Sequence, residues 1–127
     1  MSVVFDTSAL ICLIKEEEGS ENVQQYLEDE VFMSAINLAE FFSWFCLNGN
    51  DVAEAQEFIL ETQIKIIDFD SSEALESGKM ITETKKYGLS LGDRACLNLS
   101  KKLGKKVVTA DMIWLKLADK FEVELVR

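Results

Sequence analysis

The chain has 127 residues, of which 48% are hydrophobic, so we expect one domain with a buried core over residues 1–127 rather than a disordered chain. Its longest apolar run, residues 9–14, is much shorter than the roughly 18 residues that cross a bilayer, and its first residues do not resemble a secretory signal. We therefore expect a soluble, cytoplasmic protein with no membrane partner. The formal net charge of −10 argues against binding nucleic acid through broad, non-specific phosphate contacts.

Strand-like and helix-like patterns alternate along the chain. Short runs rich in β-branched and aromatic residues predict strands at 2–5, 31–33, 65–69, 106–109 and 121–126. Apolar residues at helical spacing predict helices at 7–17, 20–27, 37–47, 51–62, 71–87, 91–103 and 111–121. Because strands separated by helices of this length form parallel crossovers, the order predicts an α/β fold, with a parallel sheet flanked by helices on both faces.

Four acidic residues lie at predicted junctions between strands and helices. Asp6 and Asp111 closely follow predicted strands. Glu40 lies in the helix after the second strand, and Asp93 lies near the start of a later helix. Ligands of parallel α/β sheets bind beyond the carboxyl ends of the strands, so these carboxylates are candidates to meet at one rim.

The chain contains no histidine, so chemistry at such a rim must depend on carboxylates. Like charges held together repel one another, and a hard divalent cation such as Mg²⁺ or Mn²⁺ relieves that repulsion. A bound cation can also lower the pKa of a water molecule so that it attacks a phosphodiester. The pattern therefore indicates a metal-dependent nuclease.

Each acid also has a purely structural interpretation. Asp6 and Asp111 could be helix N-caps. Asn37-x-x-Glu40 and Ser90-x-x-Asp93 are close to capping-box patterns. Capping and metal binding do not exclude one another, and four acids at the junctions of one small domain favour the metal site.

Small polar residues beside the acids could orient the carboxylates or metal-bound water, or could serve as ordinary caps and turn residues. They are Thr7, Ser8, Asn37, Ser90 and Thr109.

Charge is distributed unevenly along the chain. Residues 1–64 hold thirteen acids and one basic residue, whereas residues 79–106 hold eight basic residues and two acids. This basic stretch, which includes Arg94, could contact RNA or could be a solvated helix face.

The same residues carry a resemblance to a known family. The chain resembles the PIN-domain ribonucleases, most closely the VapC-type toxins of bacterial and archaeal toxin–antitoxin pairs. The resemblance covers the whole chain, and residues 88–97 form its most specific motif. It is carried by Val4-Phe5-Asp6-Thr7-Ser8-Ala9-Leu10, Asn37-Leu38-Ala39-Glu40, Gly88-Leu89-Ser90-Leu91-Gly92-Asp93-Arg94-Ala95-Cys96-Leu97 and Val108-Thr109-Ala110-Asp111.

The resemblance implies a five-stranded parallel sheet in the order 3-2-1-4-5 and a Mg²⁺- or Mn²⁺-dependent endoribonuclease acting on RNA. Asp6 and Asp93 would be the firmest metal ligands of its acidic quartet. Glu40 and Asp111 would complete the site directly or through water. The resemblance also implies a homodimer and inhibition by a cognate antitoxin protein.

Two other functions fit parts of the pattern. A nuclease of the same fold could act in RNA processing or on DNA, outside any toxin–antitoxin pair. A receiver-type signalling domain also gathers acids around Mg²⁺ on a parallel sheet, with a central phosphoacceptor aspartate at a strand end. Asp68 and Asp70 flank the middle strand, but residues 88–97 would have no role in such a domain.

The helix predicted at 37–47 is apolar nearly all round, which is typical of a helix buried in a core or used at an interface. Its large apolar residues are Phe41, Phe42, Trp44, Phe45 and Leu47. Core packing and contact with a second subunit or an antitoxin both remain open. Acidic helices over residues 16–30 could attract a basic antitoxin segment.

The three cysteines, Cys12, Cys46 and Cys96, are far apart and lie in apolar helical patterns. We expect buried, reduced thiols at all three positions. A zinc site is not expected, because such sites draw on clustered Cys and His.

Overall fold

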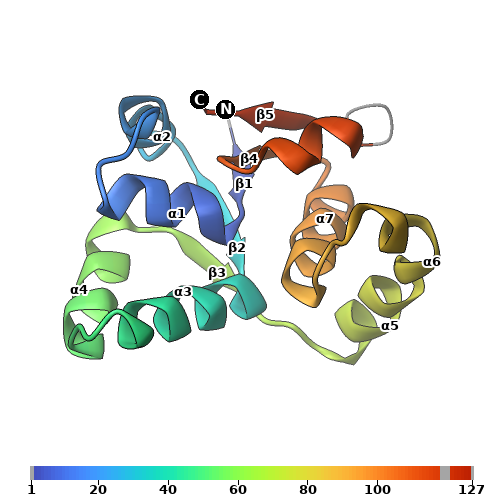
Figure 1. The fold of residues 1–127 in the computed structure, drawn as a ribbon, viewed down its shortest axis with the longest axis horizontal. Helices are drawn as coiled ribbons and strands as arrows, with labels where there is room; N and C mark the ends of the chain where they lie inside the picture. The colour runs from blue at the N-terminus through green and yellow to red at the C-terminus, as the bar shows by residue number, and fades with distance from the viewer. Residues whose placement is uncertain (1, 118–120, 127) are drawn as a thin grey trace.

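The computed structural model describes residues 2–117 and 121–126. Five parallel strands form one sheet in the order β3-β2-β1-β4-β5, which confirms the predicted fold and strand order (Figure 1). In the centre of the sheet, Val4 pairs with Phe32 on one side and with Val107 on the other. The strands are β1 (Val3–Phe5), β2 (Val31–Ser34), β3 (Lys65–Ile67), β4 (Lys106–Thr109) and β5 (Val123–Leu125).

Helices cover both faces of the sheet, with α1 to α4 on one side and α5 to α7 on the other (Figure 1). The α-helices are α1 (Thr7–Ile14), α2 (Ser20–Tyr26), α3 (Ala35–Leu47), α4 (Val52–Thr62), α5 (Ser71–Lys79), α6 (Ile81–Thr84) and α7 (Leu91–Leu103). Two 3₁₀ helices, η1 (Lys85–Tyr87) and η2 (Met112–Leu117), complete the described elements.

Alternation along the central strands divides the core into two clusters. Val3 and Phe5 of β1 point into a cluster with buried residues of α1 to α4, such as Phe41. Val4 points the other way, into a cluster with α7 and η2, where Trp114 is fully buried. Because both faces are covered, the central strand β1 is apolar throughout.

One predicted helix, at 71–87, is wrong as a single element. The structure divides it into α5, α6 and η1. Gly78 weakens the helix interior, and the hydroxyls of Thr82 and Thr84 donate to the carbonyls of Lys79 and Met80. Gly88 then ends η1 with a left-handed φ of 69°, as expected for a glycine that closes a helix.

Other boundaries also differ from the prediction. α1 ends at Ile14 rather than at residue 17, because Glu16 adopts a positive φ of 53°. In the segment 111–121, predicted as a helix, the structure has η2, while residues 118–120 lie outside the described part. The Asp111 side chain accepts a hydrogen bond from the Ile113 N–H, a local turn that favours 3₁₀ geometry.

The cysteine prediction is correct at two positions. Cys12 and Cys96 are buried, but Cys46 is exposed. Cys46 lies on α3, which is apolar nearly all round, so its sequence pattern could not assign the outer face. The same helix buries Phe41 and Phe45 and leaves Leu47 87% exposed.

The strand order also bears on the receiver-type alternative. Doubly wound signalling domains use the order 2-1-3-4-5, in which the third strand is central. Here β3 is an edge strand, so Asp68 and Asp70 lie away from the middle of the sheet. The receiver interpretation is therefore wrong.

Among residues 2–117 and 121–126, no helix is both long and apolar enough to cross a membrane.

Candidate functional site

Crossover topology brings the four predicted acids to the same edge of the sheet. Asp6 and Asp111 follow the carboxyl ends of the adjacent strands β1 and β4, and Glu40 lies on α3, which begins where β2 ends. Since α7 leads into β4, it runs against the strands and its N-terminus lies at their carboxyl edge. Asp93, in the first turn of α7, thus reaches the same edge.

Asp6 is the most deeply buried of these acids, with 4% of its surface exposed. It caps α1 by accepting the Ala9 N–H at 2.9 Å. The hydroxyls of Ser8 and Thr109 donate to the same carboxylate at 2.8 and 2.6 Å. Burial raises the pKa of Asp6 to about 6, although these three donors lower it, and the charge of Asp93 adds to the rise.

Glu40 is held by donors from two elements. Its Oε1 accepts hydrogen bonds from Thr7 Oγ1 at 2.7 Å and from Asn37 Nδ2 at 3.0 Å. Asn37 Nδ2 also lies 3.0 Å from the carbonyl oxygen of Gly92, so this buried amide joins α3 to the first turn of α7. The capping-box interpretation of Asn37 and Glu40 is wrong, because Ser34 caps α3.

Asp93 forms the capping box predicted for α7. Its Oδ2 accepts the Ser90 N–H at 2.9 Å, and its own N–H donates to Ser90 Oγ at 3.2 Å. Burial raises the pKa of Asp93; the hydrogen bonds with Ser90 lower it, and the charges of Glu40 and Asp111 raise it.

Asp111 is exposed and begins η2 through its bond from the Ile113 N–H. Its own N–H donates to Thr109 Oγ1 at 3.0 Å, and that hydroxyl donates in turn to Asp6. Ser8 Oγ likewise accepts the Ala110 N–H at 2.9 Å. The two hydroxyls therefore link the segments after β1 and β4.

The four carboxylates form an acidic cluster, in which the charge of Asp93 interacts with those of Asp6, Glu40 and Asp111. Beneath it lies the buried thiol of Cys96, whose pKa is raised well above its usual range, first by burial and then by the charges of Asp6, Asp93 and Glu40. Within the part of the chain that the structure describes, none of the four acids forms an ion pair with Lys or Arg. Within these residues, the negative charge of the cluster is therefore uncompensated.

The donor chemistry of the cluster suits a hard cation. Its side chains offer only oxygen ligands, which Mg²⁺ and Mn²⁺ prefer. The buried Oδ1 of Asn37 is a further oxygen, without a hydrogen-bond partner among the residues that the structure describes. As the side chains stand, no group of three or more Cys, Asp or Glu in residues 2–117 and 121–126 is arranged to hold one ion. Binding would therefore require carboxylates to exchange their present hydrogen bonds for a shared ion.

Arg94, the predicted RNA contact, is half-buried on α7. Its Nε is buried and has no hydrogen-bond partner among the described residues. Contact with RNA stays a prediction.

One residue of the site was missed by the sequence reasoning. A Cβ atom built on Gly92 would lie 2.3 Å from both carboxylate oxygens of Glu40. The available signal was a glycine inside an otherwise helical pattern, which is typical of close packing against a neighbouring group.

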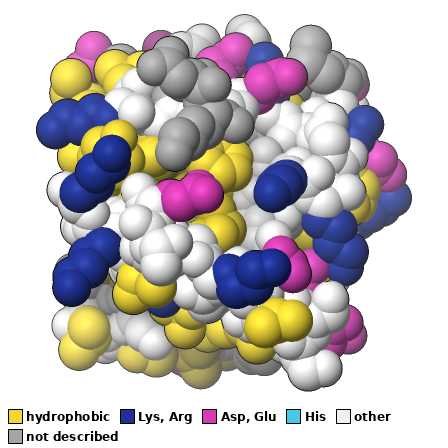
Figure 2. All heavy atoms as spheres, turned by 90° about the vertical axis from the view of Figure 1, so that its right-hand side faces the viewer, with side chains coloured by type: hydrophobic (Ala, Val, Ile, Leu, Met, Phe, Trp, Pro, Cys, Tyr) yellow, Lys and Arg dark blue, Asp and Glu magenta, His cyan; other side chains and the backbone are white. Residues whose placement is uncertain are grey.

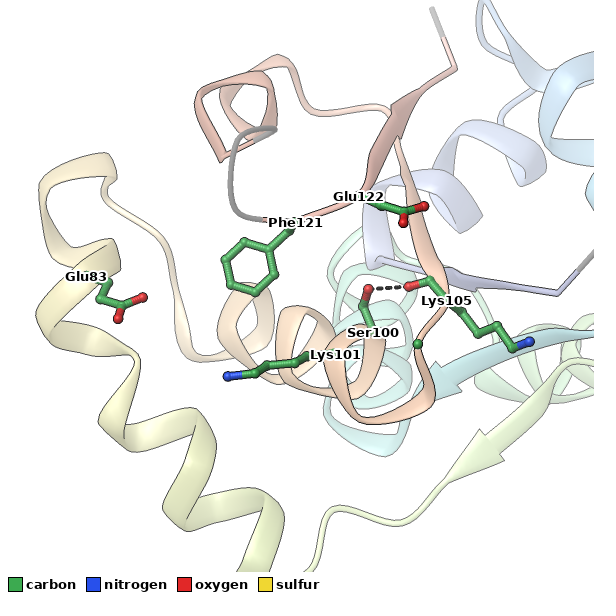
Figure 3. A pocket seen from close by; sticks show the side chains of 7 residues that line it. Glu83, Ser100, Lys101, Lys105, Phe121 and Glu122 are labelled. Atoms are coloured by element: carbon green, nitrogen blue, oxygen red, sulfur yellow. Dashed lines mark hydrogen bonds between the residues drawn. The ribbon is translucent and has the colours of Figure 1, made fainter.

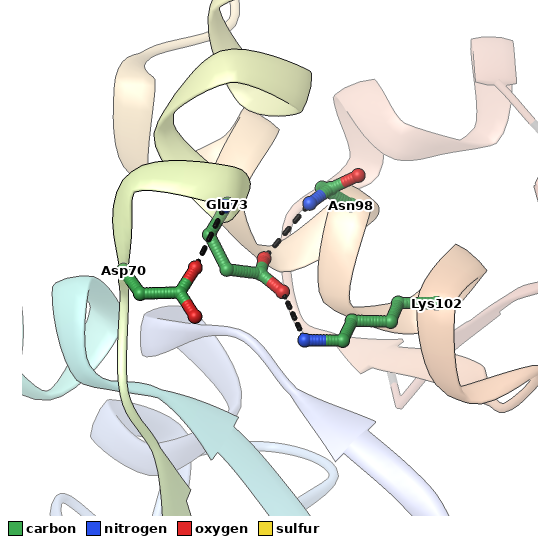
Figure 4. Close-up of polar contacts among 4 residues, drawn as sticks. All are labelled: Asp70, Glu73, Asn98 and Lys102. Atoms are coloured by element: carbon green, nitrogen blue, oxygen red, sulfur yellow. Dashed lines mark hydrogen bonds and ion pairs between the residues drawn. The ribbon is translucent and has the colours of Figure 1, made fainter.

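A second polar cluster lies between α5 and α7 (Figure 4). The carboxylate of Glu73, 4% exposed, accepts hydrogen bonds from Asn98 Nδ2 at 2.8 Å and from Lys102 Nζ at 2.9 Å. Asp70, the N-cap of α5, accepts the Glu73 N–H. This cluster joins the two helices, and the ammonium of Lys102 compensates the charge of Glu73.

A hollow of about 410 Å³ lies at the opposite end of α7 from Asp93 (Figure 3). Its charged lining residues are two lysines and two glutamates, so it has no dominant charge that would select a ligand. The lining consists of Glu83, Ser100, Lys101, Gly104, Lys105, Phe121 and Glu122.

Comparison with known proteins gives one family and a group of similar structures. The family model described as "PIN domain" matches residues 3–120. No curated protein matches the sequence. The chain is similar to solved structures of VapBC2 from Rickettsia felis, bound to a DNA fragment from its promoter (TM-score 0.75, 19% identity, 98% of both chains covered), and VapBC-1 from nontypeable Haemophilus influenzae (0.72, 21%, 99% and 98%). It is also similar to VapC20 from Mycobacterium tuberculosis, a toxin that cleaves the sarcin–ricin loop (0.74, 14%, 94% and 95%). At these identities the likeness establishes the fold.

Proposed function

The chain belongs to the PIN-domain family, and we propose that it is a metal-dependent endoribonuclease, the toxin of a type II toxin–antitoxin pair. The observation that carries the proposal is the uncompensated cluster of Asp6, Glu40, Asp93 and Asp111 at the carboxyl edge of the sheet. Repulsion between acids that lack a basic partner destabilises the fold. A bound cation relieves that repulsion, so cation binding explains why the acids are kept together.

In this proposal Asp6 and Asp93 hold the cation, with Glu40 and Asp111 completing the site directly or through water. Mg²⁺ or Mn²⁺, when bound, supplies an activated water and offsets negative charge on a phosphodiester. Ser8 and Thr109 hold the Asp6 carboxylate by their hydroxyl donors. The Thr7 hydroxyl and the Asn37 amide hold the Glu40 carboxylate, and the backbone N–H of Ser90 holds that of Asp93.

The basic side chains on the face formed by α5 to α7 favour RNA as the proposed substrate. Figure 2 shows basic side chains (Lys or Arg) spread over this face, together with apolar side chains and some acidic ones. Lys85 and Lys86, both exposed on η1, lie a few residues before the Ser90 cap of α7, while the opposite layer belongs to the strongly acidic first half of the chain. A polyanion is therefore drawn to the α5–α7 side, where Arg94 also lies.

The proposed partners are a second copy of the chain and a cognate antitoxin. Leu47 and Leu60, on α3 and α4, are 87% and 78% exposed, which is apolar surface that a partner could cover. The test of the dimer is the molar mass in solution at micromolar concentration, where a monomer would contradict it.

The activity is tested by incubating the purified protein with total cellular RNA, with Mn²⁺ or Mg²⁺ and with chelator. We expect discrete fragments that need the metal and are absent with Asp93→Asn. Equal cleavage by Asp93→Asn would show that the residue assignment is wrong. Failure to bind either metal would remove the metal site.

The toxin role is tested separately, by inducing the chain in a bacterial host. A toxin should arrest growth through Asp93, and the product of an adjacent small gene should relieve the arrest. Cleavage without arrest would instead favour a nuclease of RNA processing or one acting on DNA.

A further inference from the structure

The strongest feature that the proposed function does not use is the close approach of α7 to Glu40. Gly92 is buried at the second position of α7, and an added Cβ would lie 2.3 Å from Oε1 and from Oε2 of Glu40. Carbon and oxygen atoms do not approach so closely, so any side chain at position 92 must displace this carboxylate.

The hydrogen bonds around Glu40 show what that displacement would break. Thr7 Oγ1 and Asn37 Nδ2 both donate to Oε1, at 2.7 and 3.0 Å. Asn37 Nδ2 lies equally close, at 3.0 Å, to the carbonyl oxygen of Gly92. The amide thus ties the carboxylate and the backbone at Gly92 into one arrangement, and the space left by the missing side chain is occupied by Glu40.

We propose that Gly92 is a positioning residue for the metal site: its lack of a side chain lets Glu40 lie against the first turn of α7, beside Asp93. This inference rests on the proposed function, since it concerns the carboxylate cluster. It assigns the glycine a role in the site rather than in the helix, where glycine is unfavourable relative to alanine by roughly 0.5–1 kcal/mol.

Gly78 provides a matched control. It also lies inside a helix, α5, but beyond that helix's own backbone no described atom comes within 4 Å of a Cβ added there. Gly78→Ala and Gly92→Ala therefore make the same chemical change and both favour the helix, whereas only Gly92→Ala meets Glu40.

The test measures Mn²⁺ binding by titration calorimetry on the full chain, together with thermal unfolding in chelator. We expect Gly92→Ala to fold and to weaken Mn²⁺ binding by about 10–100-fold, the usual effect of disturbing the residues that support a ligand. Gly78→Ala should bind Mn²⁺ as the wild type does. Equal affinity of Gly92→Ala and wild type would overturn the proposal.

A Glu40→Ala background makes the test specific. Without the carboxylate the added methyl group has nothing to displace, so Gly92→Ala should weaken Mn²⁺ binding no further there. A further loss of the same size in this background, or failure of the double variant to fold, would show that Gly92 acts on something other than Glu40. A wild-type chain that binds no Mn²⁺ would instead overturn the metal site itself, and the inference with it.

Discussion

Two buried carboxylates, Asp6 and Glu73, are equally shielded from solvent but are stabilised in different ways. Both are 4% exposed. Glu73 accepts hydrogen bonds from the Asn98 amide and the Lys102 ammonium, so a cation of the protein compensates its charge. Among the described residues, Asp6 accepts bonds only from neutral groups, namely two hydroxyls and the Ala9 N–H, and its neighbour Asp93 is another acid.

The difference separates a structural carboxylate from a candidate functional one. A buried charge with a cationic partner contributes to holding two helices together, here α5 and α7. A buried charge without such a partner destabilises the fold, and it is retained where an external cation or a reaction requires it. Among the described residues, Asp6 thus lacks the cationic partner that Glu73 has in Lys102.

The largest expected effect comes from neutralising Asp6. Asp6→Asn keeps an acceptor for the Ala9 N–H but removes the charge. Loss of a residue that only supports a ligand lowers activity by up to about 100-fold, and we expect the rate of RNA cleavage to fall by more than this in Asp6→Asn. RNA cleavage rates with Mn²⁺ measure it. The control is Asp51→Asn, at an exposed N-cap of α4, which should cleave as the wild type does. Similar losses in both variants would remove the distinction.

The pKa of Asp6 predicts how the metal-free protein responds to pH. Folding raises this pKa from 3.8 to about 6, so the ionised group destabilises the fold above about pH 6, and the penalty disappears as pH falls toward 4. This difference in pKa between the unfolded and folded states corresponds to about 3 kcal/mol. In urea unfolding with chelator, the free energy of unfolding of Asp6→Asn should increase relative to that of the wild type as pH rises from 4 to 7.5. A difference independent of pH would contradict this.

Removal of the Glu73 carboxylate should affect stability rather than cleavage. Glu73→Ala leaves the buried Asn98 amide without its acceptor, which we expect to lower the free energy of unfolding by about 1–3 kcal/mol. Glu76→Ala, on the exposed side of the same helix, should change it by less than about 0.5 kcal/mol. Denaturant unfolding compares the two, and equal values would mean that the Glu73 cluster does not join α5 to α7.

The smallest effect is expected at the cap of α7. Ser90→Ala removes the hydroxyl that accepts the Asp93 N–H and should cost about 1 kcal/mol of stability. The Ser90 N–H that holds the Asp93 carboxylate remains, so cleavage should fall less than about tenfold. Thermal unfolding and cleavage rates test this, with Ser72→Ala, at an exposed position of α5, as the control. A large loss of cleavage with unchanged stability would assign Ser90 a direct role at the site.

Much of the fold could be predicted from local sequence patterns. Short apolar strands such as Val3–Phe5 and Lys106–Thr109 alternate with helices, and that pattern predicts a parallel sheet covered on both faces. The Ser90–Asp93 capping box was also predicted, because both partners lie within one turn of a helix. The interruption at Met80, between α5 and α6, was missed in the helix predicted at 71–87. The hydroxyls of Thr82 and Thr84 donate to backbone carbonyls and so compete with the helix, but they do not alter its apolar spacing.

The sequence by itself limited the candidate site to carboxylates, because the chain has no histidine and its acids lie at the junctions of strands and helices. Only the tertiary structure decided that Asp6 is buried with no basic partner among the described residues while Glu73 has Lys102, and that Glu40 lies in the space left by Gly92. The physical reason is that these relations join residues of different elements. Burial and contact across elements depend on how the helices pack on the sheet, which no local pattern records.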